Sequence, residues 1–335
     1  MKGKSTNALM AHMRNDHNID INGSTEKKKL VEMGYYHGYK AYRFKRNKAN
    51  VLNYTEFNQV VSVYDFDNEM KRIFYPYVMK LETMLKNIVI EALVSKGDTT
   101  FEQIYDSKLN RQNELNPINL GLTGKDRYRA VERYQKANKR KLKLKQSFNR
   151  AVSENYGRRD FVEHFIHKGQ PIPLWAHFEL ITLGTFGTFV SCLNSNDKVK
   201  ITKTIGTYHK GEDTDGTFLE KHIFIIKELR NSVAHNSVIF DTRFRTFKVA
   251  KPIKDQLIRE FCVRAIEFST IVDYLILILH YLKPLKFSKT DLRRLIKETD
   301  VAIKNLQEGL NDNAIFLSIV GTDYKNKLAK MLEFI

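Results

Sequence analysis

The fold class is decided by residues 55–97, which read TEFNQVVSVYDFDNEMKRIFYPYVMKLETMLKNIVIEALVSKG. Apolar side chains recur there at three- and four-residue steps from Phe57 to Leu93, which is the period of an amphipathic helix. Gly97 is expected to end this section, and Pro76 to kink or break it. The stretch predicts a long helix as the framework of a mainly α-helical protein.

The same helical period recurs on both sides of this stretch. Helices are expected at residues 24–33, 174–193, 257–282, 291–310 and 323–335. Residues 98–124 and 194–216 are expected to be connections, and residues 237–249 a short hairpin or an extended segment. No internal repeat and no βαβ alternation is found. We therefore expect an N-terminal segment, 1–50, and a helical domain, 51–335, in which residues 98–150 form a basic insertion.

Charge limits the kind of partner that this chain can have. Its 335 residues include 56 Lys and Arg against 38 Asp and Glu, a formal net charge of +18. Such an excess favours a polyanion, either nucleic acid or an acidic membrane surface, over a protein that is merely basic. The longest apolar run, Ile271–Leu282, is too short to span a bilayer and carries Asp273 and His280. Nucleic acid is therefore the favoured partner, and no membrane association is expected.

Cysteine usage indicates the compartment. The two cysteines, Cys192 and Cys262, exclude a disulfide framework and a cysteine-based zinc cluster, and they fit a reducing cytoplasm. Residues 1–18 lack the apolar core of a secretory signal. We expect a cytoplasmic protein that uses neither a metal nor a cofactor.

Two basic segments are candidate RNA-binding surfaces, because Lys and Arg neutralise phosphates and tyrosines stack on unpaired bases. The first is a cluster at residues 35–46, from which Tyr36, Arg43 and Arg46 are the candidates. The second lies within residues 125–150, and its candidates are Arg127, Arg129, Arg133, Lys136, Lys139, Arg140, Lys141, Lys143 and Lys145. The alternative for any one of these residues is a solvated position on a charged helix.

The candidate catalytic residues are Arg230, Asn231 and His235, which follow an apolar run. An arginine can contact a phosphate oxygen, a histidine can transfer a proton near neutral pH, and an amide four residues from the histidine can fix its tautomer. The spacing alone is weak, because residues 159–164 repeat it with Arg159 and His164. Carboxylates beside that second copy would repel a phosphate. The alternative for the first copy is a capped helix end with a partly buried histidine.

Four blocks of the sequence resemble the Abi-like abortive-infection proteins of the AbiD/AbiF type, within the HEPN nuclease superfamily. They are LVEMGYYHGY at 30–39, VYDFD at 63–67 followed by Lys71 and Arg72, PIPLWAHFELITLGT at 171–185, and ELRNSVAH at 228–235. The blocks keep the order of the family over about two thirds of the chain. Family members often have a second histidine after the last block, where this chain has Asn236.

The resemblance implies an all-helical, metal-independent endoribonuclease whose composite site joins two copies of the motif. Because one copy is convincing, it implies a homodimer rather than a pairing of His235 with Arg159 and His164. Glu179, a polar position of the family, either holds Arg230 or His235 or is an exposed helix carboxylate. A structured small RNA that restrains a toxin would suit the basic surface. The competing hypotheses are a non-catalytic RNA-binding protein with a structural motif, and a regulatory subunit of a neighbouring enzyme.

Overall fold

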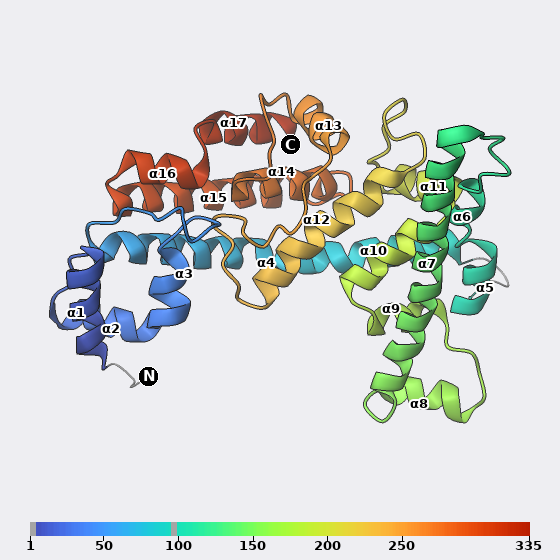
Figure 1. Cartoon of the computed structure of the whole chain (residues 1–335), viewed down its shortest axis with the longest axis horizontal. Coiled ribbons are helices and arrows are strands. Elements are labelled where there is room, and N and C mark those ends of the chain that lie inside the picture. The colour runs from blue at the N-terminus through green and yellow to red at the C-terminus, as the bar shows by residue number, and fades with distance from the viewer. Residues whose placement is uncertain (1–4, 95–98) are drawn as a thin grey trace. The chain divides into compact units, whose positions relative to one another are not determined.

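The computed structural model describes residues 5–94 and 99–335, which divide into two compact units. The terminal unit contains residues 1–79 and 228–335, and the central unit contains residues 80–227 (Figure 1). The described residues confirm the mainly α-helical class: they form helices joined by loops, with isolated bridges in place of extended strands. The expected division at residue 50 stays a prediction.

The long helix expected from residues 55–97 is α4, Phe57–Leu93. It begins in the terminal unit and ends in the central unit, and it runs through Pro76 without the break that the sequence suggested. Gly97, which was expected to end it, lies outside the described residues. A second helix, α12, Thr217–Ala234, begins in the central unit and ends in the terminal unit.

The N-terminal part of the terminal unit is more helical than its polar sequence suggested. It contains α1 (Thr6–His17), α2 (Gly23–Met33), the π-helical turn η1 (Tyr35–Tyr39) and α3 (Lys40–Tyr42). Ser5 caps α1 by accepting a hydrogen bond from the Ala8 N–H at 3.3 Å. Gly34 ends α2, as the sequence predicted.

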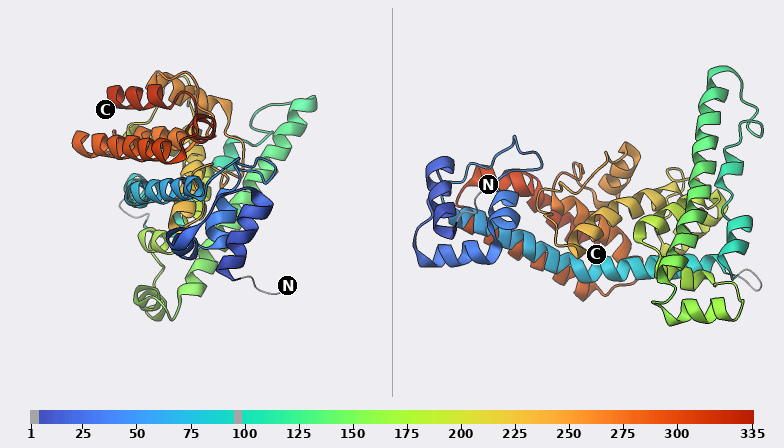
Figure 2. Two further views of the ribbon diagram at one scale, coloured as in Figure 1. Left: turned by 90° about the vertical axis from the view of Figure 1, so that its left-hand side faces the viewer. Right: turned by 60° about the horizontal axis from the view of Figure 1, so that its bottom comes forward.

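The C-terminal part of the terminal unit is a helical bundle built around α14, Ile271–Leu282, in which every residue is buried. Its other helices are α13 (Lys251–Phe261), α15 (Lys289–Leu310), α16 (Asn313–Val320) and α17 (Tyr324–Phe334). Figure 2 shows α15 and α17 lying side by side. The sequence predicted one helix over 257–282, but the chain breaks after α13, where Cys262 adopts a left-handed φ of 51°.

Asp273 and His280 of α14 are buried, and each has a partner. Asp273 and Lys327 form an ion pair at 2.7 Å, and the His280 ring lies 2.7 Å from Glu260. These pairs explain how an apolar helix carries an acid and a histidine in a protein core. None of the described helices combines the length and the apolarity needed to cross a membrane.

The central unit is organised along α7, Gly124–Asn155, which contacts α6, α9 and α10. Its helices besides α7 are α5 (Phe101–Ser107), α6 (Arg111–Glu114), α8 (Asp160–His167), α9 (Leu174–Leu180), α10 (Leu183–Cys192) and α11 (Ser195–Ile205). Three expectations are corrected here. Residues 98–124 contain α5 and α6 rather than a plain connection. Residues 174–193 form two helices because Thr182 caps α10, and residues 194–216 contain α11 rather than a plain connection.

The segment at residues 237–249 was expected to be a hairpin or extended, but it forms no strand among the described residues. It is a loop whose first residues are buried, with Ile239 and Phe240 both 0 % exposed. Their alternating apolar pattern therefore anchors a loop in the core rather than a sheet.

Candidate functional site

The motif of residues 230–235 spans the last turn of α12 and the residue after it. The backbone N–H of His235 donates to the Asn231 carbonyl at 2.9 Å, so the imidazole-bearing residue keeps the helical register. Asn236 then adopts a left-handed φ of 52°, and the Ser237 N–H bonds back to the Ser232 carbonyl at 2.8 Å. Asparagine tolerates this conformation at a helix end. Asn236 thus turns the chain away directly after His235.

Arg230 and Asn231 contact each other within the motif. Nη1 of Arg230 donates to Oδ1 of Asn231 at 3.3 Å, and both residues are half-buried. His235 is exposed, and across residues 5–94 and 99–335 its ring has no hydrogen bond to Asn231. In this structure the amide therefore orients the guanidinium and not the imidazole, which differs from the expected arrangement.

A fully buried carboxylate, that of Asp67 on α4, holds the loop that follows the motif. Its Oδ1 accepts hydrogen bonds from the backbone N–H groups of Ile239 at 2.7 Å and Phe240 at 2.6 Å. Its Oδ2 accepts a hydrogen bond from the Tyr42 hydroxyl at 2.7 Å. Burial and the nearby carboxylate both raise the pKa of Tyr42, so this hydroxyl stays protonated and donates. One side chain thus joins the N-terminal segment, α4 and the loop after His235.

Lys71 brings a positive charge to the same place. Its Nζ lies 2.7 Å from Asp67 Oδ2 and donates to Oδ1 of Asn236 at 2.8 Å. The Nζ also donates to Oδ1 of Asn68 at 3.3 Å, and the Lys71 side chain is only 10 % exposed, so these three contacts hold its ammonium in place. The sequence analysis placed Lys71 in one of the family blocks but did not assign it to the site. In the sequence, only the four-residue spacing from Asp67 points to a contact of Lys71, and this spacing is common in ordinary helices.

A cavity of about 920 Å³ lies beside His235 in the terminal unit. Its polar lining includes Glu32, Tyr36, His37, Asn68, Lys71 and His235. Apart from Asn68, these residues come from three of the four family blocks, which are far apart in the sequence. Arg230 and Asn231 are not among the lining residues, although their helix ends at the cavity.

Tyr36 and His37 reach the cavity from η1, where the backbone approaches Met33 so closely that a glycine is required. A Cβ atom on Gly38 would lie 2.6 Å from the Met33 carbonyl oxygen, which is too close for any other residue. Tyr36 is 70 % exposed, and the Lys40 ammonium lies 4.7 Å from its ring centroid. The ring is therefore largely exposed, and its predicted role in RNA binding stays a prediction.

The other two candidates from the N-terminal cluster do not line this cavity. Nη1 of Arg43 lies 3.4 Å from Nε2 of His17. The backbone N–H of Arg46 bonds to the buried Asp241 carboxylate, at a position where Arg46 has a left-handed φ of 59°. Their predicted role in RNA binding stays a prediction.

The candidate RNA-binding residues of the basic segment all lie on α7, and all except the half-buried Lys141 are exposed. The Lys141 and Lys145 ammonium groups lie 4.4 Å and 5.2 Å from the Tyr105 ring centroid. Four of the cations line a groove of about 640 Å³ against α10: Lys136, Lys139, Arg140 and Lys143. We call this the α7 groove. Thr182 and Thr185 lie on its opposite wall.

Glu179 and the second copy of the motif both belong to the central unit. Glu179 is an exposed residue of α9, and its predicted contact with Arg230 or His235 stays a prediction. Arg159 is the N-cap residue of α8, and His164 lies inside that helix. Both are exposed.

A family model described as Abi-like protein matches residues 28–241. The matched region contains η1, Asp67, Lys71, the motif itself and the first residues of the loop that Asp67 holds, including Ile239 and Phe240. No curated protein and no solved structure matches the chain.

Proposed function

Because the chain belongs to the Abi-like protein family, we propose that it acts in abortive infection as a metal-independent endoribonuclease of the HEPN type. The observation that carries this proposal is the exposed His235 imidazole, which shares a cavity wall with the fixed Lys71 ammonium. A proton acceptor and a cation beside one open cavity are the groups that cleavage of a phosphodiester requires.

The chemistry uses a nucleophile that RNA itself provides. The His235 imidazole accepts the proton of the 2′-hydroxyl while the 2′-oxygen bonds to phosphorus and the bond to the 5′-oxygen breaks. A second imidazole, in protonated form, gives its proton to the leaving 5′-oxygen. Arg230 and Lys71 stabilise the negative charge that develops on the phosphorane. The products are a 2′,3′-cyclic phosphate and a 5′-hydroxyl, and DNA resists cleavage.

The second imidazole is supplied by His235 of another copy of this chain, so the proposed enzyme is a homodimer. The motif lies at a helix end with His235 exposed, which leaves the imidazole accessible to a second copy. A symmetric dimer brings the same surface of both chains together. Each dimer then has a base and an acid in one composite site.

The α7 groove and the exposed ring of Tyr36 serve RNA binding in this proposal. Four cations along one groove neutralise successive phosphates, and an open tyrosine ring stacks on an unpaired base. A structured small RNA that restrains the toxin would bind through the same positive surface.

The test is cleavage of an RNA by the purified chain in the presence of a chelator. His235→Ala should reduce the rate by at least about a hundredfold, because general acid–base catalysis contributes about 10² to 10⁴. His164→Ala is the matched control, since it removes the exposed histidine of the second copy. Full activity of His235→Ala, with His164→Ala also active, would overturn the proposal. Wild-type protein that binds RNA without cleaving it would favour the non-catalytic alternative.

A mixed dimer tests whether the site is composite. One wild-type chain paired with one His235→Ala chain should lose nearly all activity if both imidazoles act in one reaction. If the mixed dimer instead keeps about half the activity of the wild-type dimer, each chain cleaves alone and the composite site is wrong.

A further inference from the structure

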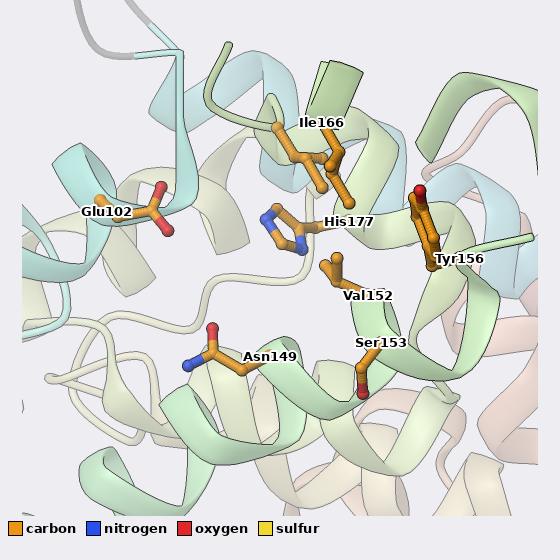
Figure 3. Close-up of a pocket in the computed structure, with 8 residues that line it drawn as sticks. Glu102, Asn149, Val152, Ser153, Tyr156, Ile166 and His177 are labelled. Carbon is orange, nitrogen blue, oxygen red and sulfur yellow. The ribbon is translucent and has the colours of Figure 1, made fainter. Parts of the chain in front are cut away.

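The central unit contains a second cavity, which none of the proposed nuclease residues lines. Its volume is about 560 Å³, within the range of small-molecule sites, and it lies among α5, α7, α8 and α9 (Figure 3). Most of its exposed wall is apolar, with Val152, Ile166 and Ile172 as the main contributors.

His177 of α9 contributes a buried polar atom to this cavity. The residue is 3 % exposed, and its Nδ1 has no hydrogen-bond partner among the described residues. Burial lowers the pKa of this imidazole to about 4, so the ring is neutral at physiological pH. Phe101 and Phe148 pack against the ring, with centroids 5.4 Å and 5.2 Å away. A buried nitrogen without a partner is costly, and a bound ligand would satisfy it.

Two further polar groups border the cavity without a protein partner. The side chains of Glu102 and Asn149 line it, and neither makes a hydrogen bond or an ion pair within the described part of the chain. Figure 3 shows the Glu102 carboxylate pointing toward the imidazole, with Val152 and Ile166 on the other side of the ring. The remaining polar groups are already used: the Ser153 hydroxyl donates to the Arg150 carbonyl at 2.9 Å, and the Tyr156 hydroxyl lies 3.0 Å from His167 Nε2.

This set of groups excludes several kinds of ligand. A phosphate or another anion would meet the Glu102 carboxylate, and no lysine or arginine of residues 5–94 and 99–335 lines this cavity. A purely apolar ligand would leave the His177 nitrogen unsatisfied. The suitable ligand is flat and mostly apolar on its faces, with N–H groups at its edge for the carboxylate.

We propose that this cavity binds a guanine base. Guanine presents two adjacent N–H donors, at N1 and at the exocyclic amine, and a carboxylate can accept both of them. The Asn149 amide can donate to a ring acceptor, and the unpaired His177 Nδ1 can form a hydrogen bond with a polar group of the base. Adenine, cytosine and uracil do not present two adjacent N–H donors of this kind to a carboxylate. The base could belong to a free guanine nucleotide or to an unpaired guanine of an RNA.

Binding is measured by calorimetry on the full-length protein, which makes the test independent of cleavage. The probes are guanosine, inosine, and a 2′-O-methyl uridine oligonucleotide that carries one guanine or one inosine. Inosine lacks the exocyclic amine, so it should bind at least about tenfold more weakly than guanosine. Binding of guanosine indicates a free nucleotide, and binding of the guanine oligonucleotide alone indicates an RNA base. Either result supports the site.

Matched variants separate the site from the fold. Glu102→Gln and His177→Phe should each weaken guanine binding at least about tenfold, while melting temperatures show that both proteins are folded. Phenylalanine keeps the packing of the His177 ring against its aromatic neighbours. Gln146→Ala, an exposed change on α7 away from the cavity, should leave binding unchanged. The proposal is overturned if neither guanine probe binds, if inosine binds equally well, or if both site variants bind as wild type.

Discussion

The substitution Asp67→Asn tests how the motif is held in place. The amide keeps an oxygen that can accept hydrogen bonds from the Ile239 and Phe240 N–H groups. Its NH₂ group, however, must then face the Lys71 ammonium and the Tyr42 hydroxyl, which both now contact Oδ2 at 2.7 Å. A donor would then meet donors at a fully buried position.

The magnitude follows from burial. Asp67 is 0 % exposed and the Lys71 side chain 10 %, so the lysine left behind gains little solvation. Removing one partner of a buried ion pair costs about 3–5 kcal/mol of unfolding free energy. In a domain of about 150–250 residues, each kcal/mol shifts the melting temperature by about 2–4 °C. We therefore expect the transition of the terminal unit to fall by about 6–20 °C.

Calorimetry measures the transition, and hydrogen exchange of the peptide that contains Ile239 and Phe240 reports on the loop. The double variant Asp67→Asn, Lys71→Met removes the unpaired cation and should recover much of the lost stability. Cleavage activity should stay low in the double variant, because Lys71 contributes to the proposed site. A single variant that melts within about 2 °C of wild type would refute this account of the site, as would a double variant no more stable than the single one.

Three further predictions concern other parts of the chain. Gly38→Ala should destabilise the terminal unit by about 1–3 kcal/mol in thermal unfolding, because the added Cβ would meet backbone atoms. Gly184→Ala is the control and should cost less stability, because the nearest atom to its Cβ belongs to the flexible Lys227 side chain. The pKa of His177 is about 4 in the folded protein against 6.5 in the unfolded chain. The stability that its neutral ring contributes to the folded state is therefore lost as the pH falls from 6.5 to 4. Relative to His177→Phe, wild type should lose about 2 kcal/mol between pH 7.5 and 5 in urea unfolding, and an unchanged difference would contradict the shift. Replacing the four cations of the α7 groove by serine should reduce the salt dependence of single-stranded RNA binding by a slope of up to about 3, and an unaltered slope would exclude the groove.

The helical period predicted the long elements but not their interruptions. The expected helix over 291–310 is α15, which is capped by Ser288: the Asp291 N–H donates to the Ser288 hydroxyl at 3.0 Å. The helix expected over 174–193 is interrupted at Thr182, which accepts a hydrogen bond from the Thr185 N–H at 3.2 Å. Apolar residues continue on both sides of this threonine, so the period does not show that a new helix begins there. The capping hydrogen bond of Thr182 therefore begins a new helix within a stretch whose apolar pattern is continuous.

In the candidate site, too, the features that depend on neighbouring residues could be predicted, and those that depend on distant residues could not. The motif could be found from its residue types and its position after an apolar helix. The contacts that hold the motif in place could not be found in this way. Asp67 bonds to Ile239 and Phe240, which lie 172 and 173 positions further along the chain. In the sequence, Asp67 and Lys71 are an acid and a base at the spacing of an ordinary helical ion pair. Only their burial and the loop that reaches them distinguish this pair from the exposed ones.

The two copies of the spacing show why the surroundings decide. Arg159 precedes α8 as its N-cap residue, and His164 lies inside the helix, beside the carboxylate of Glu163. His235 instead follows the last residue of α12, where a left-handed asparagine turns the backbone and a buried lysine holds that asparagine. The first arrangement leaves a histidine on the side of a helix among acids. The second places a histidine at a helix end, with a fixed cation on the same cavity wall, and this difference makes residues 230–235 the stronger candidate.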